Sequence, residues 1–142
     1  MKQYISTSEK ETKSIAKKFA KKFKRGVIAL SGELGAGKTT FVQGFAKGLG
    51  IKEKIISPTF VLIRQHKIPN TKKALYHVDL YRLDNLKDLE HIGLKEILSN
   101  KQNLVLIEWA EKAKKMLPQN TIWIYFNLKN KSTREIRIHF PS

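Results

Sequence analysis

The pattern of apolar positions predicts an amphipathic helix near the start of the chain. Within residues 8–24, "SEKETKSIAKKFAKKFK", apolar side chains recur at positions 15, 16, 19, 20 and 23, the period of one helix face. Ser8 followed by Glu11 has the spacing of a capping box. The opposite face carries Lys10, Lys13, Lys17, Lys21 and Lys24. We expect this row to be a solvated face, with a surface that contacts RNA as the alternative.

The rest of the chain divides into alternating strands and helices. A glycine-bounded β-branched run predicts a buried strand over 26–32, and a second helical stripe covers 39–48, with Gly50 in the position of a C-terminal cap. A further short helix is expected over 85–100, broken near Gly93. The other expected strands are residues 59–64, 74–83, 103–110, 121–128 and 134–140.

Strands and helices that alternate at this spacing predict an α/β fold of three layers, the P-loop NTPase-like arrangement with a mostly parallel central sheet. The strand pairs within 59–83 and 121–140 are expected to add antiparallel edges. Strict alternation within 74–83 predicts a half-exposed strand. Its shared face would carry Leu75, His77, Asp79, Tyr81 and Leu83. No repeat or linker interrupts the pattern, so we expect a single domain over 1–142.

Composition and charge narrow the class of protein. Hydrophobic residues make up 41% of the 142 residues and charged residues 28%, which is typical of a soluble globular protein. The absence of cysteine excludes disulfides and thiolate metal sites and fits a reducing cytosol. The start of the chain has no apolar signal region, and no apolar run approaches the ~20 residues that cross a bilayer. We therefore expect a cytoplasmic protein without membrane contact. Its net charge of +16 favours polyanionic partners, unless the lysines only solubilise the surface.

The segment "GELGAGKTT", from Gly32 to Thr40, has the P-loop pattern G-x4-G-K-T between a predicted strand and a predicted helix. Glycines let the backbone curl until successive N–H groups point at phosphate oxygens, and the helix adds the positive end of its dipole. Lys38 would reach the β- and γ-phosphates, and Thr39 would offer its hydroxyl to Mg²⁺. A glycine turn that precedes a lysine by chance is the alternative.

Magnesium also needs a carboxylate at the carboxyl end of a neighbouring strand. Glu108 ends the apolar run "LVLI", and Asp79 lies in "YHVDLY". Either could be only a loop residue, and both could act together, one on Mg²⁺ and one on the attacking water. The chain has no Asn-Lys-x-Asp motif of the kind that recognises guanine in GTPases. The segment "NKST" at 130–133 resembles it but lacks the acid. Trp109 could stack on a purine, although a plain core or surface tryptophan is the alternative.

Four motifs taken together resemble the TsaE (YjeE) family, small P-loop ATPases of bacterial tRNA threonylcarbamoyladenosine synthesis. They are "GELGAGKTTF", "SPTF" at 57–60, "YHVDLYRL" at 76–83 and "IEW" at 107–109. The resemblance covers the chain from about Ser8 to Trp109. It implies ATP and Mg²⁺ as ligands, TsaD and TsaB as partner subunits, and tRNA as an indirect partner that the basic surface could also contact directly.

The resemblance also implies a role for each matching position. The phosphates would be held by Gly35, Ala36, Gly37, Lys38, Thr39 and Thr40. Thr39, Glu108 and Asp79 would form the magnesium site, and Trp109 would lie near the base. Ser57 and Thr59 would sense the γ-phosphate, and Thr12 and Arg134 would also touch the nucleotide. The catalytic residues would be Lys38, Asp79 and Glu108.

The expected reaction is hydrolysis of ATP to ADP and phosphate by positioning and charge stabilisation. Glu33 places a further negative charge beside the phosphates, which suggests slow turnover without partners. A small-molecule P-loop kinase is one alternative, although we find no arginine pair on a plausible lid insertion. A basic RNA-binding protein with a vestigial P-loop is another. Neither alternative accounts for "SPTF" or "IEW".

Overall fold

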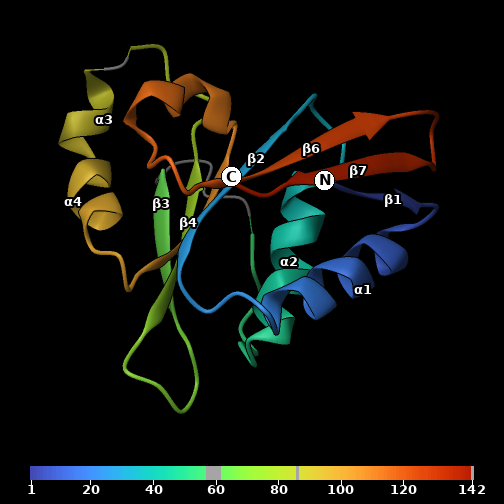
Figure 1. Cartoon of the computed structure of the whole chain (residues 1–142), viewed down its shortest axis with the longest axis horizontal. Helices are drawn as coiled ribbons and strands as arrows, with labels where there is room; N and C mark the ends of the chain where they lie inside the picture. The colour runs from blue at the N-terminus through green and yellow to red at the C-terminus, as the bar shows by residue number, and fades with distance from the viewer. Residues whose placement is uncertain (57–61, 86, 142) are drawn as a thin grey trace.

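The computed structural model describes residues 1–56, 62–85 and 87–141, and they form one mixed sheet with helices on both faces (Figure 1). The seven strands lie in the order β1-β7-β6-β2-β5-β4-β3. Their bounds are β1 (Lys2–Ser6), β2 (Gly26–Gly32), β3 (Ile63–Lys67), β4 (Ala74–Asp79), β5 (Leu104–Glu108), β6 (Ile122–Leu128) and β7 (Arg134–His139). The four central strands run parallel, and β3, β7 and β1 pair antiparallel at the two edges. The predicted three-layer α/β fold is confirmed.

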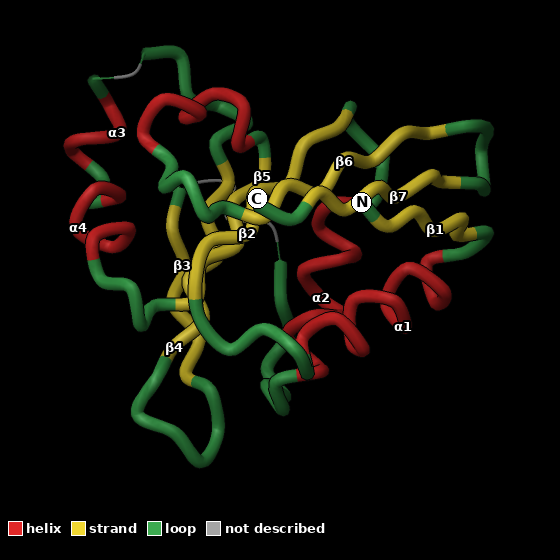
Figure 2. Tube along the Cα trace, in the orientation of Figure 1, coloured by secondary structure: helices red, strands yellow, loops and turns green. Residues whose placement is uncertain are grey.

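Each face of the sheet has its own apolar cluster. Figure 2 shows the two groups of helices that cover these faces. Helices α1 (Glu9–Ala20) and α2 (Lys38–Gly48) cover one face, where Phe19, Phe41 and Phe45 are buried. The other face is covered by α3 (Asp88–His91), α4 (Leu94–Ser99) and the 3₁₀ helix η1 (Ala110–Met116). Because β5 is covered on both sides, all five of its residues are buried, as its continuous apolar run predicts.

The register of the parallel strands determines what meets at their carboxyl ends. Leu30 of β2 and Asp79 of β4 both lie opposite Glu108, the last residue of β5. The carboxyl end of a parallel sheet is the edge at which α/β folds bind ligands. Two acids and the loop that follows β2 are therefore brought to one place by strand pairing alone.

Helices α1 and α2 pack closely because two glycines of α2 face α1. A Cβ atom on Gly44 would lie 2.5 Å from both the Cα and the carbonyl oxygen of Lys13. A Cβ atom on Gly48 would lie 2.6 Å from the carbonyl oxygen of Lys17. No side chain fits at either position without moving the backbone of α1.

Most local predictions are confirmed. The strand over 26–32 is β2, and Ser8 caps α1 by accepting a hydrogen bond from the Glu11 amide at 3.0 Å. Gly93 adopts φ +78° and separates α3 from α4. The strands expected over 121–128 and 134–140 are β6 and β7, an antiparallel pair.

Other boundaries differ from the prediction. The helix expected over 8–24 ends at Ala20, and the strand expected over 59–64 begins at Ile63, with residues 59–61 outside the described part of the chain. The strand expected over 74–83 ends at Asp79, whose carboxylate accepts a hydrogen bond from the Tyr81 amide at 3.0 Å and so turns the chain. Two elements, β1 and η1, were not predicted. Among the described residues, no helix combines the length and apolar character that spanning a bilayer requires.

Candidate functional site

A Gly-rich loop joins the carboxyl end of β2 to α2. Gly35 and Gly37 have φ of +80° and +103°, values that L side chains rarely adopt, and Gly37 is the N-cap of α2. The Ala36 amide donates to the Glu33 carbonyl at 3.1 Å, which curls the loop. The Phe41 amide bonds the Gly37 carbonyl at 2.9 Å, so the N–H groups of the preceding turn have no partner within the helix. These N–H groups and the helix dipole suit an anion.

Lys38 begins α2 and folds back against this loop. Its side chain is buried, and its ammonium donates to the carbonyls of Gly32 and Glu33, the latter at 3.0 Å. The ammonium also lies 4.1 Å from the ring centre of Trp109. Burial lowers the pKa of Lys38 below its ordinary value, and four carboxylates partly oppose this: Glu108, Glu111, Asp79 and Glu33. The site thus holds a cation that has lost much of its hydration.

A chain of hydrogen bonds links α2 to two strands through Glu108. The Thr39 hydroxyl donates to Oε1 of Glu108 at 2.8 Å, and His77 Nε2 lies 2.5 Å from Oε2. His77 is fully buried within β4, and Glu108 is 3% exposed. A carboxylate with both oxygens engaged has a fixed orientation, so Glu108 faces the start of α2.

Asp79 lies beside Glu108 on the adjacent strand. It is 8% exposed, and its Oδ1 accepts the Tyr81 amide at 3.0 Å. The prediction of a half-exposed strand is wrong here: β4 lies between β3 and β5, none of its residues is exposed, and Val78 on the second face is buried. Of the residues assigned to its shared face, Tyr81 lies beyond the strand and is 45% exposed.

The Gly-rich loop, the acids and Lys38 line a single cleft of about 630 Å³, a size that holds a nucleotide. The predicted site residues that line it are Thr12, Gly35, Gly37, Lys38, Thr39, Thr40, Asp79, Glu108, Trp109 and Arg134. Ala36 does not line the cleft, because it is buried in the apolar cluster under α1 and α2. Ser57 and Thr59 lie outside the described residues.

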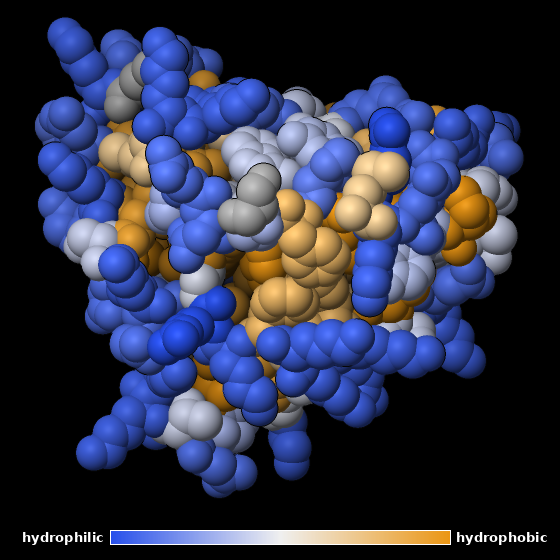
Figure 3. Space-filling view, in the orientation of Figure 1, coloured by the Kyte–Doolittle hydropathy of each residue, from blue (hydrophilic) through white to orange (hydrophobic). Residues whose placement is uncertain are grey.

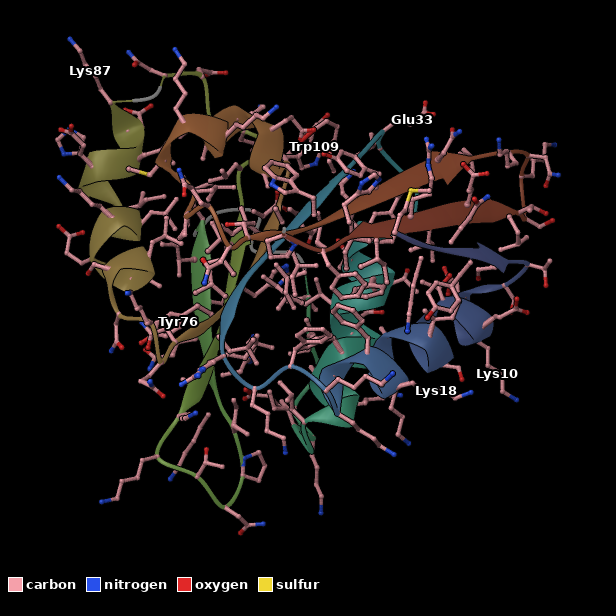
Figure 4. The ribbon with its side chains drawn as sticks, in the orientation of Figure 1. Lys10, Lys18, Glu33, Tyr76, Lys87 and Trp109 are labelled. Atoms are coloured by element: carbon pink, nitrogen blue, oxygen red, sulfur yellow. The ribbon has the colours of Figure 1, made fainter. Side chains whose placement is uncertain are left out.

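Three of these residues define the walls of the cleft. Trp109, labelled in Figure 4, comes directly after β5 and has φ of +59°. Its ring lies 5.1 Å from that of Tyr81. Arg134 donates to the Gly35 carbonyl at 3.1 Å, tying the start of β7 to the Gly-rich loop. Thr12 is buried and shares a 2.6 Å hydrogen bond with the hydroxyl of Ser6. Its hydroxyl is thus engaged within the protein.

Several lining residues were not predicted. They are Thr7, Ser8, Glu9, Leu34, Leu62, Tyr81, Arg82, Lys131 and Ser132. Lys131 and Ser132 belong to "KNKST", which the sequence pattern marks only as a turn. His77 was placed on the face of Asp79 but given no role, although its position two residues before that acid was the available signal.

The oxygen donors fit a hard cation. The Thr39 hydroxyl and the Glu108 carboxylate already face each other, and Asp79 is adjacent. Within residues 1–56, 62–85 and 87–141, no group of three or more His, Cys, Asp or Glu side chains is arranged to hold a metal. This is compatible with Mg²⁺, which is usually held by one or two carboxylates together with substrate phosphates.

Residues 6–136 match the sequence profile of the family described as threonylcarbamoyl adenosine biosynthesis protein TsaE. The chain belongs to the TsaE family. A tRNA threonylcarbamoyladenosine biosynthesis protein TsaE from Bacillus subtilis is 41% identical over 135 residues, covering 94% of this chain and 82% of the relative. The TsaE protein of Rickettsia bellii is 45% identical over 129 residues, covering 89% and 85%.

A solved structure has the same fold. The crystal structure of Bacillus subtilis YdiB superposes with a TM-score of 0.77 at 32% identity, covering 99% of this chain and 86% of that one. This structural match includes the C-terminal strands β6 and β7, which lie beyond the four sequence motifs that carry the family resemblance.

The pair formed by His77 and Glu108 predicts a specific stability effect in this TsaE family member. Replacing His77 by leucine removes a fully buried partner of Glu108, and should lower the free energy of unfolding by about 2–3 kcal/mol. Glutamine can donate from a similar position, so His77→Gln should recover about half of that loss. Urea unfolding measures both. Equal losses in the two variants would show that packing, not the hydrogen bond, stabilises this region.

Proposed function

We propose that this chain binds ATP with Mg²⁺ in the cleft and hydrolyses the ATP to ADP and phosphate, as one P-loop ATPase domain. The observation that carries the proposal is the convergence of Lys38, Thr39, Asp79 and Glu108 at the N-terminus of α2. Phosphoryl transfer needs mainly positioning and charge stabilisation, and these residues supply both.

Each residue has a distinct task in the proposed reaction. The backbone amides of Gly35 and of Gly37 to Thr40 bind the phosphates, and Lys38 leaves the carbonyls of Gly32 and Glu33 to contact them. Thr39 and Glu108 would hold Mg²⁺, which when bound would neutralise negative charge on the phosphates. Asp79 orients the attacking water or accepts its proton.

The wall residues support the choice of a purine nucleotide. Trp109 offers a ring face beside Lys38, and the hydroxyls of Ser8 and Ser132 line the same cleft. Lys38 must exchange its present partners for phosphate oxygens, and Glu33 adds negative charge near the loop. Both features favour slow turnover by the isolated chain.

The family supports a role in tRNA threonylcarbamoyladenosine biosynthesis. Within that role, we propose that ATP hydrolysis by this chain acts on a complex of TsaD and TsaB. The direct test is release of labelled inorganic phosphate from γ-labelled ATP by the purified chain, alone and with both partner subunits. Label on a metabolite instead of free phosphate would favour a small-molecule kinase. No nucleotide binding at all would favour an RNA-binding protein with a vestigial P-loop.

The two acids should differ in their effect on the magnesium requirement. Glu108 touches Thr39, whereas Asp79 has a described bond to the Tyr81 amide. Glu108→Gln should therefore raise the Mg²⁺ concentration for half-maximal ATP hydrolysis by about tenfold, and Asp79→Asn by less than about threefold. Magnesium titrations at saturating ATP measure both. A larger shift in Asp79→Asn would reverse the two assignments.

A further inference from the structure

The positive charge of this chain is concentrated in one part of the sequence. Residues 13–73 contain 15 of the 28 lysines and arginines but only two of the 12 acids, Glu33 and Glu53. Residues 74–142 contain 11 basic and eight acidic residues, which nearly balance. Lysine used only to solubilise a surface would not need this separation, so residues 13–73, which include most of α1, all of α2 and β3, have a distinct charge.

Part of this charge surrounds a second hollow, away from the cleft. Lys13 of α1, Lys47 of α2, and Lys52 and Lys54 of the following loop line a groove of about 530 Å³, called here the basic groove. None of these residues lines the first cleft. In Figure 3 hydrophilic side chains dominate the lower rim, where α1 and the β3–β4 hairpin lie, and Figure 4 shows Lys18 of α1 pointing outward.

The basic groove has a fixed framework. The close packing at Gly44 holds Lys13 against α2, and the Gln43 side-chain amide donates to the Ile55 carbonyl at 3.0 Å. Among the described residues, Glu53 is the one acid that lines the groove, and its carboxylate contacts His66. Four lysines therefore surround a pre-formed hollow in which the single carboxylate already has a partner.

We propose that the basic groove binds the phosphate backbone of a structured RNA. Lysines are flexible point charges that suit a series of phosphates. In the part of the chain that the structure describes, no arginine lines the groove to bind one small anion with two parallel hydrogen bonds. An anionic membrane is the less favoured polyanion, because an interfacial helix needs an available apolar face. In α1 that face is buried against the core through Ala16, Phe19 and Ala20.

The choice of tRNA as the RNA rests on the proposed function. The basic groove lies near the C-terminal end of α2, whereas the cleft lies at its N-terminus. An 11-residue helix is about 16 Å long, so bound RNA and bound nucleotide need not compete. The chain would then hold tRNA at one end of α2 while it turns over ATP at the other.

Fluorescence anisotropy with a labelled tRNA transcript, over a range of salt concentrations, tests the proposal. The groove variant replaces Lys13, Lys47, Lys52 and Lys54 by glutamine. The matched control makes the same four changes on the opposite side of the sheet, at the exposed Lys95, Lys101, Lys114 and Lys115. A plot of the logarithm of the association constant against the logarithm of the salt concentration has a negative slope. This slope should become less negative by about three in the groove variant and by less than one in the control.

Two further measurements separate the possible failures. Phosphate release from ATP should be unchanged in the groove variant, and Lys38→Ala should bind tRNA like the wild type, so the two proposals fail independently. Equal weakening in the groove variant and the control would overturn the proposal, since binding would follow net charge alone. It would also be overturned if the groove changes abolished binding to phosphatidylglycerol vesicles while tRNA binding persisted.

Discussion

Replacing Lys38 by alanine should lower kcat/KM for ATP hydrolysis by about a hundred- to a thousandfold. The ammonium is buried at the mouth of the Gly-rich loop, where a contact with a phosphate acts in a poorly hydrated environment. Burial lowers the pKa of Lys38, because the nearby carboxylates stabilise its charged form only in part. A bound phosphate would add the negative charge that stabilises the ammonium. Steady-state phosphate release with Mg²⁺ measures the loss.

A companion variant shows that such a loss does not come from misfolding. Since the pKa of Lys38 is lowered on folding, its charged form disfavours the folded state, and this cost disappears as the pH rises toward the ordinary lysine pKa. Lys38→Met keeps the length of the side chain without its charge, so its free energy of unfolding near pH 7 should equal or exceed that of the wild type. Wild-type hydrolysis in either variant would exclude the proposed role of Lys38.

The fold could be predicted as far as local periodicity determines it. The buried strand over 26–32, the capping box at Ser8 and the helix break at Gly93 all rest on neighbours within a few residues. The parallel centre of the sheet could also be predicted. A helix between two strands carries the chain back across the sheet, so the second strand runs parallel to the first.

The missed elements depend on distant partners. The strand β1 is five residues long and is stabilised by pairing with β7 at the far end of the chain. Its sequence, "KQYIS", has too few apolar positions to show a period. The premature end of β4 depends on a side chain, because the Asp79 carboxylate bonds the Tyr81 amide within what the alternation presents as a continuous strand.

The candidate site was predicted in its residues but not in its contacts. Motif spacing placed Lys38 at the start of a helix, Asp79 within a strand and Glu108 after the run "LVLI", and the fold brings all three to one cleft. Spacing could not show that Thr39 donates a hydrogen bond to Glu108, or that His77 bonds the other oxygen of Glu108. These contacts join three separate elements, α2, β5 and β4. The roles of these residues toward ATP and Mg²⁺ remain predictions.

Replacing Gly44 by alanine should lower the free energy of unfolding by about 2 kcal/mol, and replacing it by valine by about 4 kcal/mol. An added Cβ would lie 2.5 Å from the backbone of Lys13, so α1 must move away from the phenylalanines that it covers. Overpacking of this kind costs up to about 3 kcal/mol, and the better helix propensity of alanine returns only about 1 kcal/mol. Urea unfolding followed by circular dichroism measures the change.

Ser14→Ala is the matched control, because Ser14 is exposed on α1 and lacks that contact. Its free energy of unfolding should stay within about 0.5 kcal/mol of the wild type. Gly48→Ala should behave like Gly44→Ala, since its Cβ would meet the Lys17 carbonyl at 2.6 Å. If alanine at both glycines stabilised the protein, helix propensity would outweigh packing, and the close approach of α1 to α2 would not constrain these positions. Destabilisation at both would instead show that the glycines allow α1 to dock on α2, the contact that also holds Lys13 beside the basic groove.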